Sequence, residues 1–592
     1  MDRNTVIGLS LIFVIFLGWM YYMQPSPEQL EKMRKEQVLR ENLEQRAKEA
    51  NPSTTMIAPV EDESITSQEV ISGAFGASVF SDTVLTAVDT DLYHFTFSNL
   101  GAGPVEAFLI NYNRWDGAPV QLFKDTLHAA YSLGFVTTEN YNVETRGVLF
   151  TPITTEPVRI SGDETATLVY ELPVKTGRMI LTYTFYGNKY QVGVTARFEG
   201  ISSYVSGRKV DFAFKSGLTV TEKFYSIEAK ESAAHLYAGD EHEKLLLTNA
   251  GKEDLNATGK IDWVATKSKF FTQVIKPNVL TDAAFLQGEV TGDISTENAR
   301  SHYESQLTVS IPDDNILSFD LYLGPVQLST LSAFHDTADD LVNVGYEWLR
   351  FFSEPMVRFV IVPFFNFFGD LIGNYGLVIV LFGIGIKLVL YPFTKKSFES
   401  AAAMRQLAPE MTAIKEKISD PQKQQEAIMK MYKTAGVNPI GGCLPNLLQM
   451  PILVTLWMYF QNSILIRQKT FLWASDLSAP DVILSLPFTI PFLGDHISGF
   501  VLLMAASMVI QMQTSGQTQS NPQMKFLPYM MPIMLFVFFN NVAAGLSLYY
   551  FVYNVVSIAQ QLLINKSVDH TKLMASIQGK PKAPAKIHKK KK

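Results

Sequence analysis

The sequence lacks most of the features by which soluble enzymes are recognised. It has a single cysteine, Cys443, which excludes an intrachain disulfide. Charged residues make up only 18% of the chain and hydrophobic residues 47%. This composition is low in charge for a soluble protein, but it is not apolar enough for a protein made only of membrane spans. Because 592 residues are too many for one hydrophobic core, we expect a membrane part and a separate water-soluble part.

Motifs for catalysis and metal binding are also missing. The sequence contains no HExxH, no CxxC pair and no nucleophile elbow. Five histidines lie in residues 70–330, and only two of them are close together, at a spacing typical of a loop. We interpret them as surface or core residues, and predict no enzyme activity, no metal, no cofactor and no small-molecule substrate. The five are His94, His128, His235, His242 and His302.

An apolar run of 18 residues, 6–23, lies near the start of the chain. Its far end carries Trp19, Tyr21 and Tyr22 in place of a small-residue cleavage site, and aromatic residues are typical of a membrane interface. We therefore predict an uncleaved signal-anchor span over residues 1–24, with the N-terminus in the cytoplasm.

The chain changes character after a mixed-charge linker at 25–65. Over 66–335, apolar and polar residues alternate in short stretches that Gly, Asn, Asp and Pro separate. This pattern predicts a large antiparallel β-sandwich. The clearest stretches are LYHFTFS (92–98), RMILTYTFY (178–186), YQVGVTARF (190–198) and NILSFDLYL (315–323).

Residues 342–372 are predicted to form an amphipathic helix that lies in the membrane interface, with charges on one face and aromatic rings on the other. Pro355 and Pro363 are expected to break the segment before it could span. A helix packed on the β-sandwich is the alternative. The charged residues are Glu347, Arg350, Glu354 and Arg358, and the aromatic residues are Trp348, Phe351, Phe352 and Phe359.

Five more membrane spans are predicted downstream, six in all. The second occupies 373–393. The fourth and fifth are short, about 15 residues, and short spans imply a locally thinned bilayer. NNVAAG at 540–545 is expected to separate the fifth span from the sixth. Spans three to six fall within 439–565, at about 441–460, about 498–513 and in the two halves of 526–564.

The distribution of Lys and Arg gives the orientation, because these residues accumulate on the cytoplasmic side. The segment 394–438 carries eight of them and is predicted to be a cytoplasmic helical hairpin that breaks at Asp420-Pro421. The segment between spans three and four has only Arg467 and Lys469. The tail, 566–592, holds nine Lys and one Asp. Both termini are therefore predicted to be cytoplasmic and the β-sandwich to lie on the opposite side.

One charge stands inside the second span. The stretch GLVIVLFGIGIKLVLYPF is apolar except for Lys387, and a charge at membrane depth costs about 3 kcal/mol unless it faces an interior or a cavity. Lys387 could also extend to the inner interface, but helix side chains lean toward the N-terminus, here toward mid-membrane. Since Gly376, Gly383 and Lys387 share one face, we favour a cavity between closely packed helices.

Polar residues on other spans could line such a cavity. They form one continuous stripe on the sixth span and pairs one turn apart on the third and fourth. No carboxylate in the spans is placed to pair with Lys387, so we expect the lysine to receive an incoming anionic group. Hydrogen bonding between helices is the alternative for each set. The residues are Tyr550, Asn554, Ser557 and Gln561 in the sixth span, Asn446 and Gln449 in the third, and Ser507 and Gln511 in the fourth.

Three stretches resemble the YidC family of membrane protein insertases: GIGIKLVLYPFTKKS, NPIGGCLPNLLQMPI and GLSLYYFVYNVVSIAQQLLI. The order of parts also resembles the Gram-negative form, an α-helical polytopic inner-membrane protein with a five-helix core and a large periplasmic antiparallel β-sandwich. The resemblance implies a hydrophilic groove open to the cytoplasm and to lipid. Nascent membrane proteins would enter this groove and leave into the bilayer, alone or with the Sec translocon.

The resemblance also implies roles for single residues. Lys387 matches the positive residue of the groove, Tyr550 the tyrosine of the sixth span and Gln449 the glutamine of the third. Gly383 stands where a small polar residue is expected. The tail implies contact with the ribosome, and binding to anionic membrane lipids is the alternative. The tail ends in Lys589, Lys590, Lys591 and Lys592.

Two other classes of protein fit the sequence less well. A transporter or channel would show inverted repeats, broken helices with ion ligands or intramembrane carboxylates, and the sequence has none of these. A membrane-anchored protein that binds or modifies sugars would account for the β-sandwich, but not for the polar stripes or the cytoplasmic hairpin.

Overall fold

A computed structural model of the chain describes residues 83–125, 128–294, 298–437, 444–490, 493–515 and 527–567. The predicted signal anchor and linker, the terminal lysines Lys589 to Lys592, and Cys443 lie outside the described residues. Residues 410–430 belong to a different compact unit from 68–409 and 431–592, and the larger unit holds both the β-rich part and the membrane helices.

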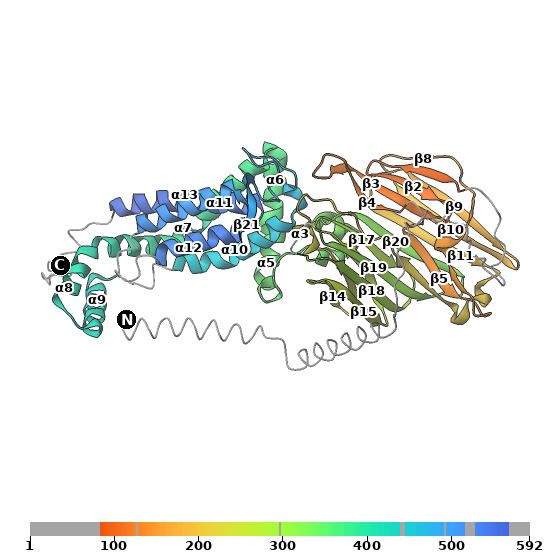
Figure 1. Cartoon of the computed structure of the whole chain (residues 1–592), viewed down its shortest axis with the longest axis horizontal. Helices are drawn as coiled ribbons and strands as arrows, with labels where there is room; N and C mark the ends of the chain where they lie inside the picture. Colours follow the sequence, from red (N-terminus) through yellow and green to blue (C-terminus); the bar gives the residue numbers. More distant parts are fainter. Residues whose placement is uncertain are drawn as a thin grey trace, which may run out of the picture. The chain divides into compact units, whose positions relative to one another are not determined.

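The β-rich part consists of three sheets (Figure 1), in which neighbouring strands are antiparallel except for β1 and β8. The nine-stranded sheet has the order β14 (Glu241–Leu245), β13 (Ala233–Ala238), β16 (Ile261–Lys267), β17 (Phe271–Pro277), β20 (Ile316–Pro325), β11 (Gln191–Glu199), β10 (Gly177–Tyr186), β9 (Thr165–Val174) and β7 (Thr151–Pro152). The six-stranded sheet has the order β15 (Gly251–Thr258), β18 (Thr281–Thr291), β19 (Arg300–Ser310), β12 (Lys209–Phe214), β5 (Tyr131–Val136) and β6 (Asn142–Glu144). The five-stranded sheet has the order β4 (Pro119–Lys124), β3 (Gly103–Asn113), β2 (Tyr93–Ser98), β1 (Leu85–Asp89) and β8 (Val158–Arg159).

The alternating stretches of the sequence are strands β2, β10, β11 and β20, so the predicted β-sandwich is confirmed. Alternate side chains of a strand point to opposite faces of its sheet, and one face is buried. In β10, Leu181, Tyr183 and Phe185 are buried while the residues between them are only partly covered. The Phe185 ring centroid lies 5.5 Å from that of Phe97 in β2, so these two sheets share one hydrophobic core.

The membrane part contains five helices that run alongside one another in Figure 1: α7 (Tyr375–Gln406), α10 (Leu444–Asn462), α11 (Gly499–Ser515), α12 (Leu527–Phe539) and α13 (Ala544–Ser567). Helix α13 contacts α7, α10 and α11, and α11 also contacts α12. Their buried faces form a second hydrophobic core, which includes Phe382 of α7, Leu456 of α10, Met504 of α11 and Tyr549 of α13.

Three helical segments of the described chain are long and apolar enough to cross a membrane: Arg350–Ile372, Tyr375–Gln406 and Ala544–Ser567. The last two correspond to the predicted second and sixth spans. Helices α11 and α12 have 17 and 13 described residues and both border the segment 516–526, which lies outside the described residues, so the short lengths of the fourth and fifth spans stay a prediction. A helical membrane part is therefore confirmed, whereas the count of six spans is not.

The predicted break at Pro355 and Pro363 is wrong, because the segment stays helical through both prolines. A proline ring clashes with the carbonyl four residues earlier, which normally ends a helix. A wider π-helical turn precedes Pro363 and changes the hydrogen-bond partners at this point. The segment consists of α5 (Arg350–Met356), the π-helix η7 (Val357–Ile361) and α6 (Val362–Ile372).

The charged face of this segment binds the chain that leaves the sandwich. Arg350 contacts Asp340, and Arg358 Nη2 lies 2.6 Å from Asp339 Oδ2. Glu354 accepts hydrogen bonds from Nε of both arginines, at 3.1 and 2.9 Å. The predicted spacing of these charges thus produces a continuous ion-pair network.

Two helices follow α7, namely α8 (Ala408–Lys417) and α9 (Pro421–Ala435). Proline suits the first position of a helix because its φ is already fixed near the helical value. The Asp420 side chain accepts a hydrogen bond from the Gln422 N–H at 2.9 Å. The predicted break at Asp420-Pro421 is therefore confirmed, while α7 continues past the predicted end of its span at residue 393.

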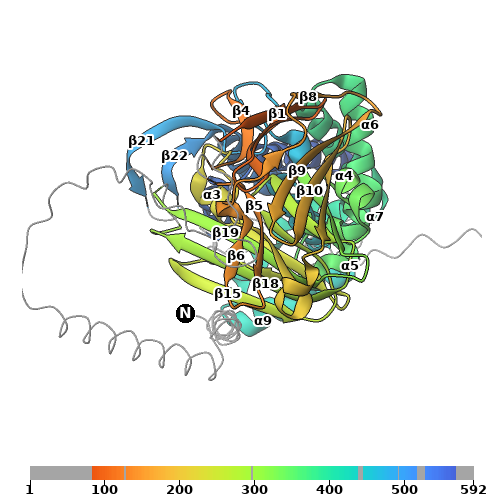
Figure 2. The same cartoon turned by 90° about the vertical axis from the view of Figure 1, so that its right-hand side faces the viewer.

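A two-stranded ribbon, β21 (Val482–Ile490) and β22 (Gly494–Ser498), forms a separate sheet (Figure 2). It was not predicted from the sequence. Buried Asn540, in the turn between α12 and α13, fixes it: Nδ2 donates to the His496 carbonyl at 2.7 Å, and Oδ1 accepts from the Ser498 N–H at 3.0 Å.

Candidate functional site

Lys387 lies on the buried face of α7, with 1% of its surface exposed. Its Nζ is 3.6 Å from the centroid of the Tyr553 ring in α13 and 5.3 Å from that of Phe398, further along α7. Aromatic faces carry partial negative charge and attract cations. Among the described residues, no carboxylate forms an ion pair with Lys387.

Gly383 lies one turn before Lys387 and allows α13 to approach α7. A Cβ atom at Gly383 would lie 3.3 Å from Val552 Cγ1 and 3.6 Å from Tyr549 Cδ2. The helices therefore pack closely beside the lysine, as the shared face of small residues predicts. Gly376, on the same face, lies against the ring of Phe471, which a Cβ atom would meet at 2.1 Å.

The polar stripe of α13 faces other helices. Asn554 Nδ2 donates to Ser507 Oγ in α11 at 3.0 Å, and Gln561 Nε2 donates to the Phe398 carbonyl at 3.2 Å. Ser557 is also buried, and its hydroxyl donates to the Tyr553 carbonyl at 2.7 Å. The structure thus brings together the stripes predicted on the fourth and sixth spans.

The remaining predicted residues are placed differently. Gln449 of α10 is buried and donates to the Tyr549 hydroxyl at 3.1 Å. Tyr550 and Gln511 are only half-buried. Asn446 lies in the first turn of α10. Hydrogen bonds between helices thus involve Asn554, Ser507, Gln561 and Gln449, whereas Lys387 makes none in the described chain.

Two family models match the chain. One, described as YidC periplasmic domain, matches residues 85–359, and the other, described as 60Kd inner membrane protein, matches 367–572. The membrane protein insertase YidC of Chloroherpeton thalassium is 34% identical over 593 residues, which cover 98% of this chain and 99% of that protein. The chain belongs to the YidC family of membrane protein insertases.

A second relative agrees with this assignment. The membrane protein insertase YidC of Chlorobium phaeovibrioides is 36% identical over 577 residues, which cover 96% of both chains. A crystal structure described as active YidC insertase with its first transmembrane domain resolved matches 82% of this chain and 95% of its own, with 20% identity and a TM-score of 0.33. Family membership assigns the helical part to the inner membrane and the β-sandwich to the periplasm.

Sequence reasoning missed the two rings beside Lys387, Tyr553 and Phe398. Tyr553 is four residues from both Tyr549 and Ser557, which are buried, so the helical period could have identified it. The stripe was instead assigned to begin at Tyr550, one residue away from the fully buried Tyr549.

Proposed function

We propose that this protein inserts newly made membrane proteins into the bilayer, and that Lys387 receives the anionic flank of the incoming chain. One observation carries the proposal: a buried ammonium group that faces two aromatic rings and, within the described chain, no carboxylate. A buried charge without an ionic partner is unfavourable for stability, so a role in function explains its presence better. Insertion changes no covalent bond, and we assign the protein no catalytic chemistry.

The flank would pass through a hydrophilic groove between α7, α10, α11 and α13, open to the cytoplasm and to lipid. Polar side chains on the facing sides of these helices support this route, since they offer partners to a polar segment. Short α11 and α12 suit a thinned bilayer, in which the distance without water is smaller. The proposed lining comprises Gly383, Asn446, Gln449, Ser507, Gln511, Tyr550, Asn554, Ser557 and Gln561.

We place the segment Arg350–Ile372 in the interface of the inner membrane that faces the periplasm. Trp348, Phe351 and Phe359, on and just before it, are 71%, 80% and 77% exposed. Large aromatic side chains at the boundary of a membrane bind the headgroup region. The opposite face is held to the sandwich by the ion pairs of Arg350 and Arg358.

Two partners are proposed beyond the substrate. The lysine-rich tail, 566–592, would bind ribosomal RNA by releasing its counterions, with anionic lipid as the competing partner. The Sec translocon would act with the protein on some of its substrates. Ribosome binding by the full chain should weaken as the salt concentration rises. A chain that ends at residue 565 should lose this binding and still insert a short substrate.

The test of Lys387 uses purified protein in liposomes and a single-span substrate with an acidic N-terminal tail. Insertion is scored by protease protection of the tail. Lys387→Ala should reduce insertion at least tenfold, while Lys387→Arg, which keeps the charge, should retain most of it. Lys395→Ala is the matched control, because Lys395 lies on the same helix with its side chain 52% exposed.

A substrate with a neutral tail separates charge from other causes. It should insert equally well into liposomes with the unmutated protein and with Lys387→Ala. Equal insertion of the acidic tail by both proteins would show that Lys387 does not receive the flank. Failure of the unmutated protein to insert either substrate would contradict autonomous insertion.

A further inference from the structure

The segment between α10 and the ribbon connects the two hydrophobic cores of the protein. We name residues 464–481 the capping loop. Ile464 belongs to the core of the β-sandwich, and Ile466, two residues later, belongs to the core of the membrane helices. Both side chains are buried, so the loop is packed against the sandwich and the helices at once.

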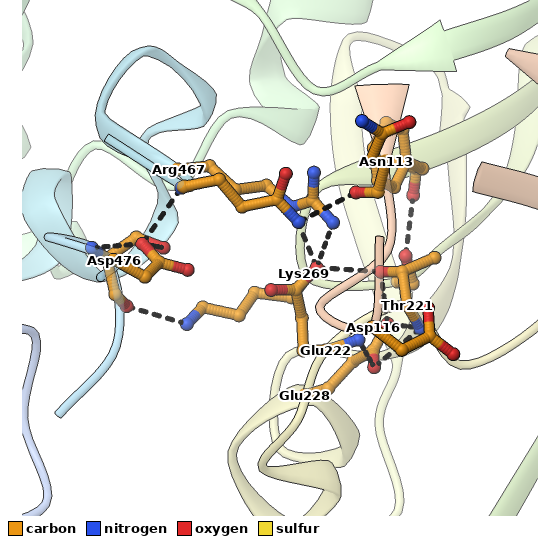
Figure 3. Close-up of polar contacts among 12 residues, drawn as sticks. Asn113, Asp116, Thr221, Glu222, Glu228, Lys269, Arg467 and Asp476 are labelled. Atoms are coloured by element: carbon orange, nitrogen blue, oxygen red, sulfur yellow. Dashed lines mark hydrogen bonds and ion pairs between the residues drawn. The ribbon is translucent and has the colours of Figure 1, made fainter. Parts of the chain in front are cut away.

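An ion pair joins the capping loop to the sandwich (Figure 3). Arg467 Nε donates to Glu222 Oε1 at 2.8 Å, and Nη2 lies 2.7 Å from the same oxygen. The two side chains are only 2% and 9% exposed. The rings of Phe270 and Phe271 flank the guanidinium, with centroids 5.5 and 5.1 Å from Cζ. A buried pair of this kind is strongly destabilised when one partner is lost, because the other charge stays buried.

Two further contacts hold the loop to the sandwich. Lys269, which is 3% exposed, donates from Nζ to the Ser478 carbonyl at 3.2 Å (Figure 3). Gln468 Nε2 donates to the Asn113 carbonyl at 2.8 Å. Between these contacts, one oxygen of Asp476 accepts from the N–H groups of Gln468 and Ser478, at 2.9 and 2.7 Å, and so fixes the shape of the loop.

The opposite side of the capping loop covers the start of α13. The Ala479 carbonyl accepts from the Ala544 N–H, and the Leu477 carbonyl accepts from the Gly545 N–H, both at 2.9 Å. The first N–H groups of a helix have no partner within the helix, so the loop satisfies two of them. A Cβ atom at Gly545 would come 3.1 Å from the Leu477 carbonyl oxygen, which shows how closely the loop lies on the helix.

The capping loop also covers the starts of α11 and α7. Asp481 Oδ2 accepts from the Phe500 N–H at 2.7 Å, at the first turn of α11. The Phe471 ring lies against Gly376 in the first turn of α7. One loop thus contacts the starts of three helices, of which α7 carries Lys387 and α13 carries Tyr553.

We propose that Arg467 and Lys269 are positioning residues for insertion. Through them the β-sandwich holds the capping loop on the starts of α7, α11 and α13 and keeps this end of the groove closed. The effect on insertion rests on the proposed function, whereas the holding of the loop rests on these contacts alone. The sandwich is then part of the insertion machinery, and its partner is the capping loop.

The experiment measures loop opening and insertion separately. In the full chain, Cys443→Ser removes the native thiol and Ser478→Cys places a new thiol in the capping loop, at a position 1% exposed. Reaction with a hydrophilic maleimide is followed in nanodiscs. Arg467→Gln and Lys269→Met should each speed labelling at least tenfold and slow insertion of the acidic-tailed substrate at least fivefold. Arg467→Lys, which keeps the charge, should restore most of both.

Arg178→Gln is the matched control, since it breaks an exposed ion pair with Glu199 on the same sandwich and should change neither readout. Unchanged labelling in Arg467→Gln and Lys269→Met would overturn the proposal. Faster labelling with normal insertion would overturn the positioning role. If the unmutated protein inserts nothing, the proposed function fails, and labelling still decides whether the sandwich holds the loop. Should Arg467→Gln not fold, Lys269→Met and Arg467→Lys decide the same question.

Discussion

The two regions of this protein treat a buried cation in opposite ways. At the junction with the sandwich, Arg467 has a carboxylate at hydrogen-bond distance as well as two aromatic rings. In the membrane part, Lys387 also faces two rings, but within the described residues it has no carboxylate. Both side chains are almost fully buried.

The difference teaches how a structural charge can be distinguished from a functional one. The desolvation cost of Arg467 is offset by Glu222, and the pair holds two parts of the chain together. The desolvation cost of Lys387 is offset only by ring faces, which give about 2 kcal/mol even when desolvated. A buried cation that has aromatic rings but no carboxylate beside it is available to a ligand that carries a negative group.

The largest expected effect comes from removing each cation in turn. Arg467→Met should lower the free energy of unfolding by about 3–5 kcal/mol, because Glu222 would remain buried without a partner. Lys387→Met should leave the free energy of unfolding unchanged or raise it, since the change leaves no buried carboxylate without a partner. Thermal unfolding of the full chain in detergent measures both. An equal loss in the two variants would remove the distinction between the regions.

The second prediction concerns the pH dependence of the junction. Burial, and the negative Glu222 beside it, raise the pKa of Glu228 from 4.5 to about 7, while hydrogen bonds from Thr221 and Glu222 act in the opposite direction. The folded state therefore holds this proton more tightly than the unfolded state. The resulting stability, on the order of 3 kcal/mol, is fully present below about pH 4.5 and is lost as the pH rises through 7.

Melting temperatures of the full chain between pH 5 and 8 test this sign. Glu228→Gln should flatten the fall in melting temperature toward pH 8, whatever its effect on overall stability. Glu199→Gln, a change at a partly exposed carboxylate on the same sandwich, is the control and should keep the slope. A slope that persists in Glu228→Gln would assign the titration to another group. The charged neighbours to consider are Glu222, Lys269 and Glu231.

A smaller effect is expected from the ring beside the lysine. Tyr553→Leu should lower the free energy of unfolding by about 1–2 kcal/mol beyond the loss of packing, because Lys387 would lose its nearest aromatic face. Tyr553→Phe keeps the ring and should have little effect. In a Lys387→Met background the two Tyr553 variants should differ by the packing loss alone, and a double-mutant cycle isolates this coupling. No coupling would mean that the ring only fills space.

The smallest effect tests whether the polar stripe serves structure. Asn554→Leu removes the hydrogen bond to Ser507 and should cost about 1 kcal/mol of stability, the usual size for bonds between membrane helices. Insertion of the acidic-tailed substrate should fall less than threefold. A fall as large as that of Lys387→Ala would place Asn554 in direct contact with the substrate. Ser507→Ala removes the same bond from the other side and serves as the control.

The sequence predicted those features that depend on local periodicity. The alternation of apolar and polar residues with a period of two identified strands such as β10, because one face of each strand is buried. The apolar runs identified α7 and α13, and the lone charge drew attention to Lys387. On α13, Asn554, Ser557 and Gln561 are buried on the face that the stripe predicts, whereas Tyr550, its first member, is half-buried. Several tyrosines stand together there, and Tyr553 was missed because the stripe was started at Tyr550 and not at Tyr549.

Features that depend on distant parts of the chain could not be predicted in this way. Glu222 and Arg467 are 245 residues apart, and no local pattern marks them as partners. The π-turn before Pro363 was missed because the sequence rule considers only the clash of a proline ring in a regular helix. The count of six spans is not confirmed: residues 1–24 lie outside the described chain, and within it three helical segments are long and apolar enough to cross a membrane.

Helix α7 has a mechanical consequence. Its 32 residues give a rod about 48 Å long, well beyond the roughly 30 Å of a bilayer's hydrocarbon core. Lys387 lies near the middle of this rod, and Gln406 ends it about 28 Å away. Rocking by about 10° around the lysine would move Gln406 by about 5 Å. A force applied at the Gln406 end of α7 would therefore also move the part of the helix that carries the buried charge.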